Sequence, residues 1–286
     1  MSLRAWAELA RPRTLRTAAN AVGFDPREAT VSRDSGVDVA DLITDPYTSV
    51  ADVRDRLDAL ETRFREHDDR RAVFLTVYVA VTERVQDRIR ADEFRNPEWV
   101  ADYLVTFADY YRRALLAYER ENFDAVPKPW LLAFDTALEG RALVVQDALL
   151  GINAHVVHDL ALAVHDVGID PNRAGKHADH VAVNDVLREL VDVEQRLLAD
   201  HYAPGLAELD AAAGRIDEAL ASLSLEEGRE FAWHGAVALT DLRTSIADRI
   251  VRWLLDAVAT GNGRTIVATT DSPLFARLRE LEAEER

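Results

Sequence analysis

Apolar residues recur three or four positions apart along most of the chain. This spacing places them on one face of an α-helix, the face that packs against a core. One such series is Phe74, Tyr78, Val81, Val85 and Ile89. The only run typical of a strand is TIVATT, which is too short to build a sheet alone. The pattern therefore predicts an all-α fold, a single bundle-like domain of many helices.

Proline and glycine divide the chain into three parts. The first part contains Pro12, Pro26, Gly36 and Pro46. These residues interrupt any long element there. We expect an irregular N-terminal extension over residues 1–48, the all-α domain over residues 49–260, and a C-terminal extension over residues 261–286.

The last core helix is predicted over about residues 225–259, from its helical periodicity. Its expected buried residues are Phe231, Ala238, Leu242, Ile246 and Trp253. The sequence GNGR follows, and its glycines predict the end of the helix. The terminal RLRELEAEER is polar and predicts a helical tail.

The charge of the chain excludes several partners. Acidic residues outnumber basic ones by 51 to 34, which gives a net charge of −17. No cluster of lysine or arginine offsets this charge, so its field repels nucleic acid and anionic membranes. We expect no nucleic-acid partner and no membrane partner, which leaves a small-molecule substrate or a protein partner of unknown identity.

Arginine replaces lysine almost completely, because Lys128 and Lys176 are the only lysines among the 34 basic residues. Excess surface carboxylate with little lysine suits solubility in concentrated salt, where screening removes the self-repulsion. This composition indicates a halophilic source. A GC-rich genome, which also favours arginine, is the alternative explanation.

Several common signatures do not occur in the sequence. Without cysteine, the chain has no disulfide, thiolate metal ligand or cysteine nucleophile. Neither a glycine-rich phosphate loop nor a G-x-S-x-G turn is found. No run of about 18 apolar residues would span a membrane, and the N-terminus has no signal-peptide core. We expect a cytoplasmic protein.

Three of the eight histidines fall in one stretch, GINAHVVHDLALAVHD. In helical projection, its aliphatic side chains cluster on one side and His155, His158 and Asp159 on the other. This division predicts a helix with one buried and one solvated face. Asn153 on the apolar side and Leu162 on the polar side depart from it. Leu162 indicates that the second face also contacts protein.

The next helix, HADHVAVNDVL, brings further polar residues toward an apolar face. Asp179 and His180 project toward that face, and Asn184 lies at its edge. The loop between the two helices suits an antiparallel pair. Such a pair would place His155 and Asp159, which are neighbours at a spacing of four, beside Asp179 and His180. Their nitrogen and oxygen donors are those that zinc or iron accepts.

Each of these residues also has a plain structural explanation. His155 and Asp159 can form a simple surface pair, which is the usual meaning of an isolated pair at this spacing. Asp179 lies at a helix start, where a carboxylate can satisfy free N–H groups.

Five segments carry a further signal: FLTVYVAVTERVQDRI, FADYYRRAL, KPWLLAF, LLGINAHVVHDLALAV and DHVAVNDVL. In this order they resemble a family of uncharacterised helical proteins, a numbered domain of unknown function common in actinobacteria and halophilic archaea. The resemblance covers residues 50–200. The matching positions are Asn153, Ala154, His155, Asp159, Asp179 and Asn184. The resemblance implies a helical fold and supports these residues, but it implies no reaction.

Two hypotheses for the function remain open. In the first, the protein is a metal-dependent, hydrolase-like enzyme whose zinc or iron lowers the pKa of a bound water. The metal ligands are then His155, Asp159, Asp179 and His180, and the catalytic candidates that orient the substrate are Asn153 and Asn184. In the second, the protein is a non-catalytic helical binding or scaffold protein whose buried polar network fixes the helix register.

Overall fold

The computed structural model describes residues 2–29, 31–33, 35–202, 225–242 and 244–268. These residues form helices and no strand, which confirms the all-α prediction. The first part contains α1 (Ser2–Leu9), α2 (Pro12–Asn20), the 3₁₀ turn η1 (Pro26–Glu28) and α3 (Ala40–Ile43). The middle contains α4 (Val50–Glu66), α5 (Ala72–Arg90), α6 (Pro97–Glu119), the 3₁₀ turn η2 (Phe123–Ala125) and α7 (Lys128–Glu139). The last part contains α8 (Val144–Asn153), the π-helical turn η3 (Ala154–Asp159), α9 (Leu160–Asp166), α10 (Arg173–Tyr202), α13 (Leu225–Asp241) and α14 (Ser245–Ala268).

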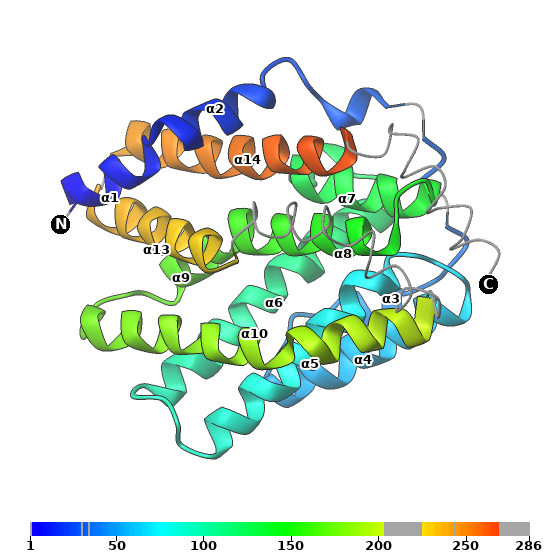
Figure 1. Ribbon diagram of the computed structural model, residues 1–286, viewed down its shortest axis with the longest axis horizontal. Coiled ribbons are helices and arrows are strands. Elements are labelled where there is room, and N and C mark those ends of the chain that lie inside the picture. The colour runs from blue at the N-terminus through cyan, green and yellow to red at the C-terminus, as the bar shows by residue number, and fades with distance from the viewer. Residues whose placement is uncertain (1, 30, 34, 203–224, 243, 269–286) are drawn as a thin grey trace.

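The continuous helix α8–η3–α9 passes through the middle of the molecule (Figure 1). It contacts α5, α6, α7, α13 and α14. The stretch Val144–Asp166 is long and apolar enough to cross a membrane, but 83% of its apolar window is buried inside the protein. It is therefore placed as a core helix.

The predicted solvated face of this helix is buried along η3, although Asp166 at its end is exposed. His155, His158 and Asp159 are all buried, because helices pack around the whole circumference of η3. The contact with protein that Leu162 indicated is confirmed, since Leu162 is buried as well. A single amphipathic projection fails for a helix that has neighbours on every side.

Close helix approaches account for two glycines inside helices, Gly151 and Gly261. A Cβ at Gly151 would lie 2.5 Å from the Phe74 ring of α5, so the glycine permits this close contact. Helix α8 continues through Gly151 without a break. A Cβ at Gly261 would lie 2.0 Å from the carbonyl oxygen of Thr17 in α2. The glycine lets α2 lie directly on α14 (Figure 1).

The ends of the chain differ from the predicted pattern. Two helices, α1 and α2, occur in the region expected to be irregular, and they pack on α13 and α14. Helix α14 continues through GNGR and TIVA to Ala268, because these glycines serve helix contact and do not end the helix. The domain boundaries stay predictions. Residues 269–286, with the predicted polar tail, lie outside the described residues.

The helix predicted over about residues 225–259 is in fact two helices, α13 and α14, because α13 ends at Asp241 and α14 begins at Ser245. Ala238, before the break, is buried as predicted. Beyond it, Ile246 is 62% and Trp253 is 54% exposed, so their predicted burial was wrong. The error arises because one helical phase was carried across the break.

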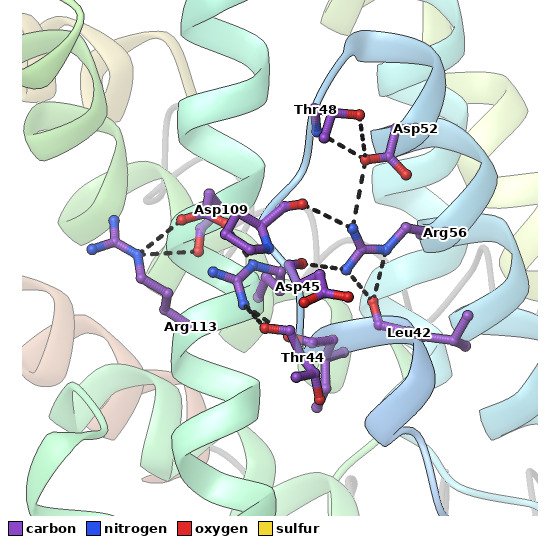
Figure 2. Close-up of polar contacts among 11 residues, drawn as sticks. Leu42, Thr44, Asp45, Thr48, Asp52, Arg56, Asp109 and Arg113 are labelled. Atoms are coloured by element: carbon purple, nitrogen blue, oxygen red, sulfur yellow. Dashed lines mark hydrogen bonds and ion pairs between the residues drawn. The ribbon is translucent and has the colours of Figure 1, made fainter.

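Arginine side chains fasten the segment before α4 to the bundle (Figure 2). Arg56 of α4 donates from Nε to the Leu42 carbonyl at 2.9 Å and from Nη2 to the Asp45 carbonyl at 2.6 Å. Arg112 of α6 donates to the Ile43 carbonyl at 2.8 Å. These bonds hold the end of the N-terminal region against the two helices that follow it.

Candidate functional site

The η3 turn places one buried carboxylate between two imidazole rings. Asp159 Oδ2 accepts hydrogen bonds from His155 Nδ1 at 3.0 Å and from Trp130 Nε1 at 2.7 Å. Its Oδ1 accepts from His158 Nδ1 at 2.7 Å. An ionised carboxylate can only accept, so both imidazole Nδ1 atoms carry hydrogen. We call these four residues the Asp159 cluster; π-helical turns such as η3 are frequent at functional sites.

Charge is matched inside the Asp159 cluster. Burial raises the pKa of Asp159, but hydrogen bonds from the two imidazoles outweigh burial and hold the pKa below 3.8. Burial lowers the pKa of His155 below 6.5, against the opposing effect of Asp159. For His158, burial also acts downward, but Asp159 outweighs it and raises the pKa above 6.5. The ionised Asp159 therefore faces a neutral His155, and His158 is the imidazole that protonates more readily.

A cavity of about 100 Å³ lies between α5, α6, α10, α13 and the α8–η3 helix. Its walls are mainly aliphatic and aromatic, and they include Val81, Leu104, Phe107, Val183 and Leu187. The hydroxyl groups of Tyr78 and Thr82, two further wall residues, are buried without a hydrogen-bond partner. An apolar pocket with a few polar groups is the usual form of a small-molecule site.

His155 connects the Asp159 cluster to this cavity. Its ring stacks on Phe107 with centroids 3.5 Å apart, and Tyr78 meets it edge-on at 4.7 Å. The Nδ1 edge of the ring bonds to Asp159, which lies outside the cavity wall, whereas the ring itself is part of that wall. The opposite atom, Nε2, is buried and has no partner. It is an acceptor, because the hydrogen is on Nδ1.

A second polar cluster, the Arg229 cluster, joins α10 to α13. His180 Nε2 donates to the Arg229 carbonyl at 3.0 Å, and Arg229 Nη2 donates to the His180 carbonyl at 2.6 Å. Arg229 Nε donates to Asn184 Oδ1 at 2.7 Å. Burial, assisted by the Arg229 charge, lowers the pKa of His180 well below 6.5. His180 is therefore neutral, and its Nδ1 has no partner.

Two predicted site residues hold helices in place. Asp179 accepts hydrogen bonds from the backbone N–H groups of Arg95 and Asn96, both at 2.8 Å, and so fixes the start of α6. The Asn153 amide donates to the Ala259 carbonyl of α14 at 2.7 Å. Neither Asn153 nor Asp179 lines the cavity, and Asn184 is connected to it only through Arg229.

The four predicted metal ligands do not form one group. His155 and Asp159 belong to the Asp159 cluster, whereas Asp179 binds backbone N–H groups and His180 binds a carbonyl. In the part of the chain that the structure describes, no three His, Asp or Glu side chains are placed to hold a metal ion. The zinc or iron site stays a prediction, and the four residues predicted to ligate the metal bond to separate partners.

Arg229 is the site residue that sequence reasoning missed. It lies in LEEGREFAW, where neighbouring glutamates make an arginine resemble an exposed, ion-paired residue. Only the tertiary structure reveals that it is 4% exposed and lines the cavity. Tyr78 and Thr82 likewise look like ordinary core positions in the sequence.

Residues 50–269 match a family of unknown function, DUF5995. The chain belongs to this family. The matched region contains the whole cavity wall and both polar clusters, and it extends the resemblance predicted over residues 50–200. No curated protein and no solved structure matches the chain. DUF5995 membership brings no activity with it, so a function has to be argued from the site.

Proposed function

We propose that the protein binds a small, mainly apolar molecule in the cavity, with His155 contacting the polar group of that molecule. The observation that carries the proposal is the buried Nε2 of His155, which has no hydrogen-bond partner, on a residue that lines the cavity. A buried acceptor without a partner costs about 1–3 kcal/mol. A ligand with a hydroxyl or N–H group would remove this cost.

Shape and chemistry restrict the ligand. The cavity of about 100 Å³ is smaller than an engineered, enclosed apolar cavity of about 150 Å³ that holds benzene, but it is partly open. It therefore suits a small ring or a short chain, part of which extends beyond the enclosed volume. Since Asp159 keeps the hydrogen on Nδ1, the group that meets Nε2 has to be a hydrogen-bond donor. The apolar walls supply affinity through burial of the rest of the ligand.

A pair of valines on α10 provides a matched test of the binding site. Val183 is buried and lines the cavity, whereas Val181 is 40% exposed. In calorimetric titrations with benzyl alcohol, we expect wild type and Val181→Phe to bind equally. Val183→Phe fills the cavity and should weaken binding by at least about tenfold. Leu187→Phe, at a half-buried wall position, repeats the test with less risk to folding.

Equal affinity in all of these variants would place the benzyl alcohol elsewhere and contradict the proposal. The role of His155 is tested by comparing benzyl alcohol with toluene, which lacks the hydroxyl. A hydrogen bond worth about 1 kcal/mol gives roughly a fivefold preference. His155→Leu should remove that preference while toluene still binds.

The same geometry supports a second candidate, acid–base catalysis on the bound molecule. A neutral imidazole oriented by a carboxylate is the arrangement of a general base. His155 Nε2 would take a proton from the ligand, and Asp159 would stabilise the imidazolium that forms.

Benzisoxazole is a suitable probe, because removal of its C3 proton forms the nitrile as the N–O bond breaks to give a phenolate. Wild type should accelerate this ring opening, and both His155→Leu and Val183→Phe should lose the acceleration. An equal rate in His155→Leu would reject His155 as the base.

The expectations from composition stay predictions: a cytoplasmic, halophilic protein without nucleic-acid or membrane partners. The halophilic expectation is tested by unfolding in increasing potassium chloride. A net charge of −17 favours rising stability as salt screens the repulsion.

A further inference from the structure

Arg229 is a buried cation whose partners are neutral. Its guanidinium donates to the Asn184 amide oxygen at 2.7 Å and to the His180 carbonyl at 2.6 Å. Neither acceptor carries a charge. Arg229 also forms part of the cavity wall, and Tyr103, another wall residue, lies beside it.

The acidic residues nearest to Arg229 along α13 bind other partners. Glu226 pairs with Arg188 at 2.7 Å, and Glu230 pairs with His177 at 3.0 Å. Glu227 pairs with Arg13 at 3.3 Å. Over the described ranges of the chain, no carboxylate oxygen lies within 4.0 Å of the Arg229 nitrogens.

The other buried arginines behave differently. Three arginines with described side chains are less than 5% exposed, namely Arg71, Arg112 and Arg229. Arg71 bonds to the Asp69 carboxylate at 2.6 Å, and Arg112 bonds to the Asp109 carboxylate at 2.5 Å. Among the described residues, Arg229 is the one of these three that has no carboxylate partner.

Burying a charge without an opposite charge is strongly unfavourable. The missing negative charge would be supplied most directly by a molecule that occupies the cavity.

We infer that the ligand of this cavity is a small, mainly apolar carboxylic acid that also carries a hydroxyl or N–H group. Its carboxylate pairs with Arg229, and the hydroxyl or N–H group meets His155 Nε2. The inference rests on the proposed function and names its ligand class. The guanidinium offers a planar fork of donors that matches a carboxylate. The aliphatic and aromatic walls cover the hydrocarbon part, and the cavity volume limits that part to a small ring or short chain.

Benzoate and benzamide test the inference, since they share size and shape but only benzoate is charged at pH 7. Calorimetry on the full chain should give tighter binding for benzoate in wild type. Arg229→Met keeps the length of the side chain without its charge, and it should weaken benzoate binding by about 30-fold or more. The affinity for benzamide should change little. Arg229→Lys should retain part of the benzoate affinity.

Arg188→Met is the matched control, because it removes a positive charge from the exposed surface of the neighbouring helix. It should bind benzoate as wild type does. Circular dichroism of each variant checks that the helices are retained. If Arg229→Met does not fold, comparing benzoate with benzamide in wild type still tests the carboxylate inference, since benzoate should raise the Tm more than benzamide does.

Each outcome has a distinct meaning. Equal affinity for benzoate and benzamide, with no effect of Arg229→Met, overturns the carboxylate inference and leaves the proposed binding function intact. A benzoate affinity that Arg188→Met reduces as much as Arg229→Met also overturns it, because general surface charge would then explain the binding. No saturable binding of benzoate, benzamide or benzyl alcohol overturns both proposals.

Discussion

The Asp159 cluster and the Arg229 cluster lie at the same cavity and solve the burial of charge in opposite ways. Asp159 accepts hydrogen bonds from three N–H donors, and two of these donors belong to imidazoles that can carry a compensating positive charge. Among the described residues, Arg229 donates to neutral oxygen atoms and to no carboxylate. A buried charge with a complete set of partners is explained by the fold itself. A buried charge without a counter-ion is better explained by what the cavity binds.

Removing the Asp159 carboxylate should have the largest effect on stability. Asp159→Leu leaves three buried donors without an acceptor, so we expect the free energy of unfolding to fall by about 3–5 kcal/mol. Denaturation with urea measures this loss. Asp159→Asn keeps the shape and one acceptor oxygen and should lose less. A small effect of Asp159→Leu would contradict the structural role of this cluster.

The indole donor to Asp159 should have the next largest effect. Trp130 is fully buried, and Trp130→Phe removes one hydrogen bond to a charged group together with part of the ring. We expect a loss of about 2–3 kcal/mol in the free energy of unfolding. A double-mutant cycle with Asp159→Asn would separate the hydrogen bond from the packing, and additive effects would argue against direct coupling.

His180 should make stability depend on pH. Its folded pKa lies well below 6.5, so the unfolded chain binds a proton that the folded protein does not. The contribution of His180 to stability therefore increases as the pH rises to about 6.5. It decreases as the pH is lowered from that value, with a slope of up to about 1.4 kcal/mol per pH unit. The lowered pKa of His155 adds to this trend, and the raised pKa of His158 opposes it.

Unfolding measured between pH 5 and 7 should be flatter in His180→Gln than in wild type. Around His180 the charged or titratable neighbours are Arg229, His177 and Tyr103. An unchanged pH profile would mean that the imidazole is protonated in the folded protein or that another group dominates.

The smallest change in stability is expected at Arg229. Removing a buried charge that has no opposite charge relieves an unfavourable burial, which offsets the hydrogen bonds lost to Asn184 and the His180 carbonyl. Arg229→Met should therefore alter the free energy of unfolding by less than about 1 kcal/mol. A loss as large as that of Asp159→Leu would remove the contrast between the two clusters and assign Arg229 to the fold.

The helical fold could be predicted because its signal is local. The series from Phe74 to Ile89 repeats with the period of a helix, and α5 spans it. Local pattern fails where a neighbour decides the outcome. Gly261 looks like a helix end, but Thr17, far away in the sequence, requires a glycine there. Ile246 lies on the predicted apolar face, but the break between α13 and α14 rotates it outward.

The candidate site was only partly predictable for the same reason. The spacing of four between His155 and Asp159 is visible in the sequence, and the structure joins these residues. The sequence also placed Asp179 and His180 on an apolar face, but it could not reveal that Asp179 bonds to backbone groups just before α6 and His180 to a backbone group of α13. Arg229 gave no signal, because its missing counter-charge becomes visible only once the orientation of its glutamate neighbours is known.

The wide turn η3 also makes the number of residues in this stretch matter. A deletion of one residue there would restore ordinary helical winding and change the directions in which the side chains of η3 point relative to one another. His155 and His158 could then no longer both bond to the Asp159 carboxylate, although every remaining residue of the motif would be unchanged. Among family members, the length of this stretch should therefore separate proteins that keep the paired imidazoles from those that have lost them, and residue identity alone would not.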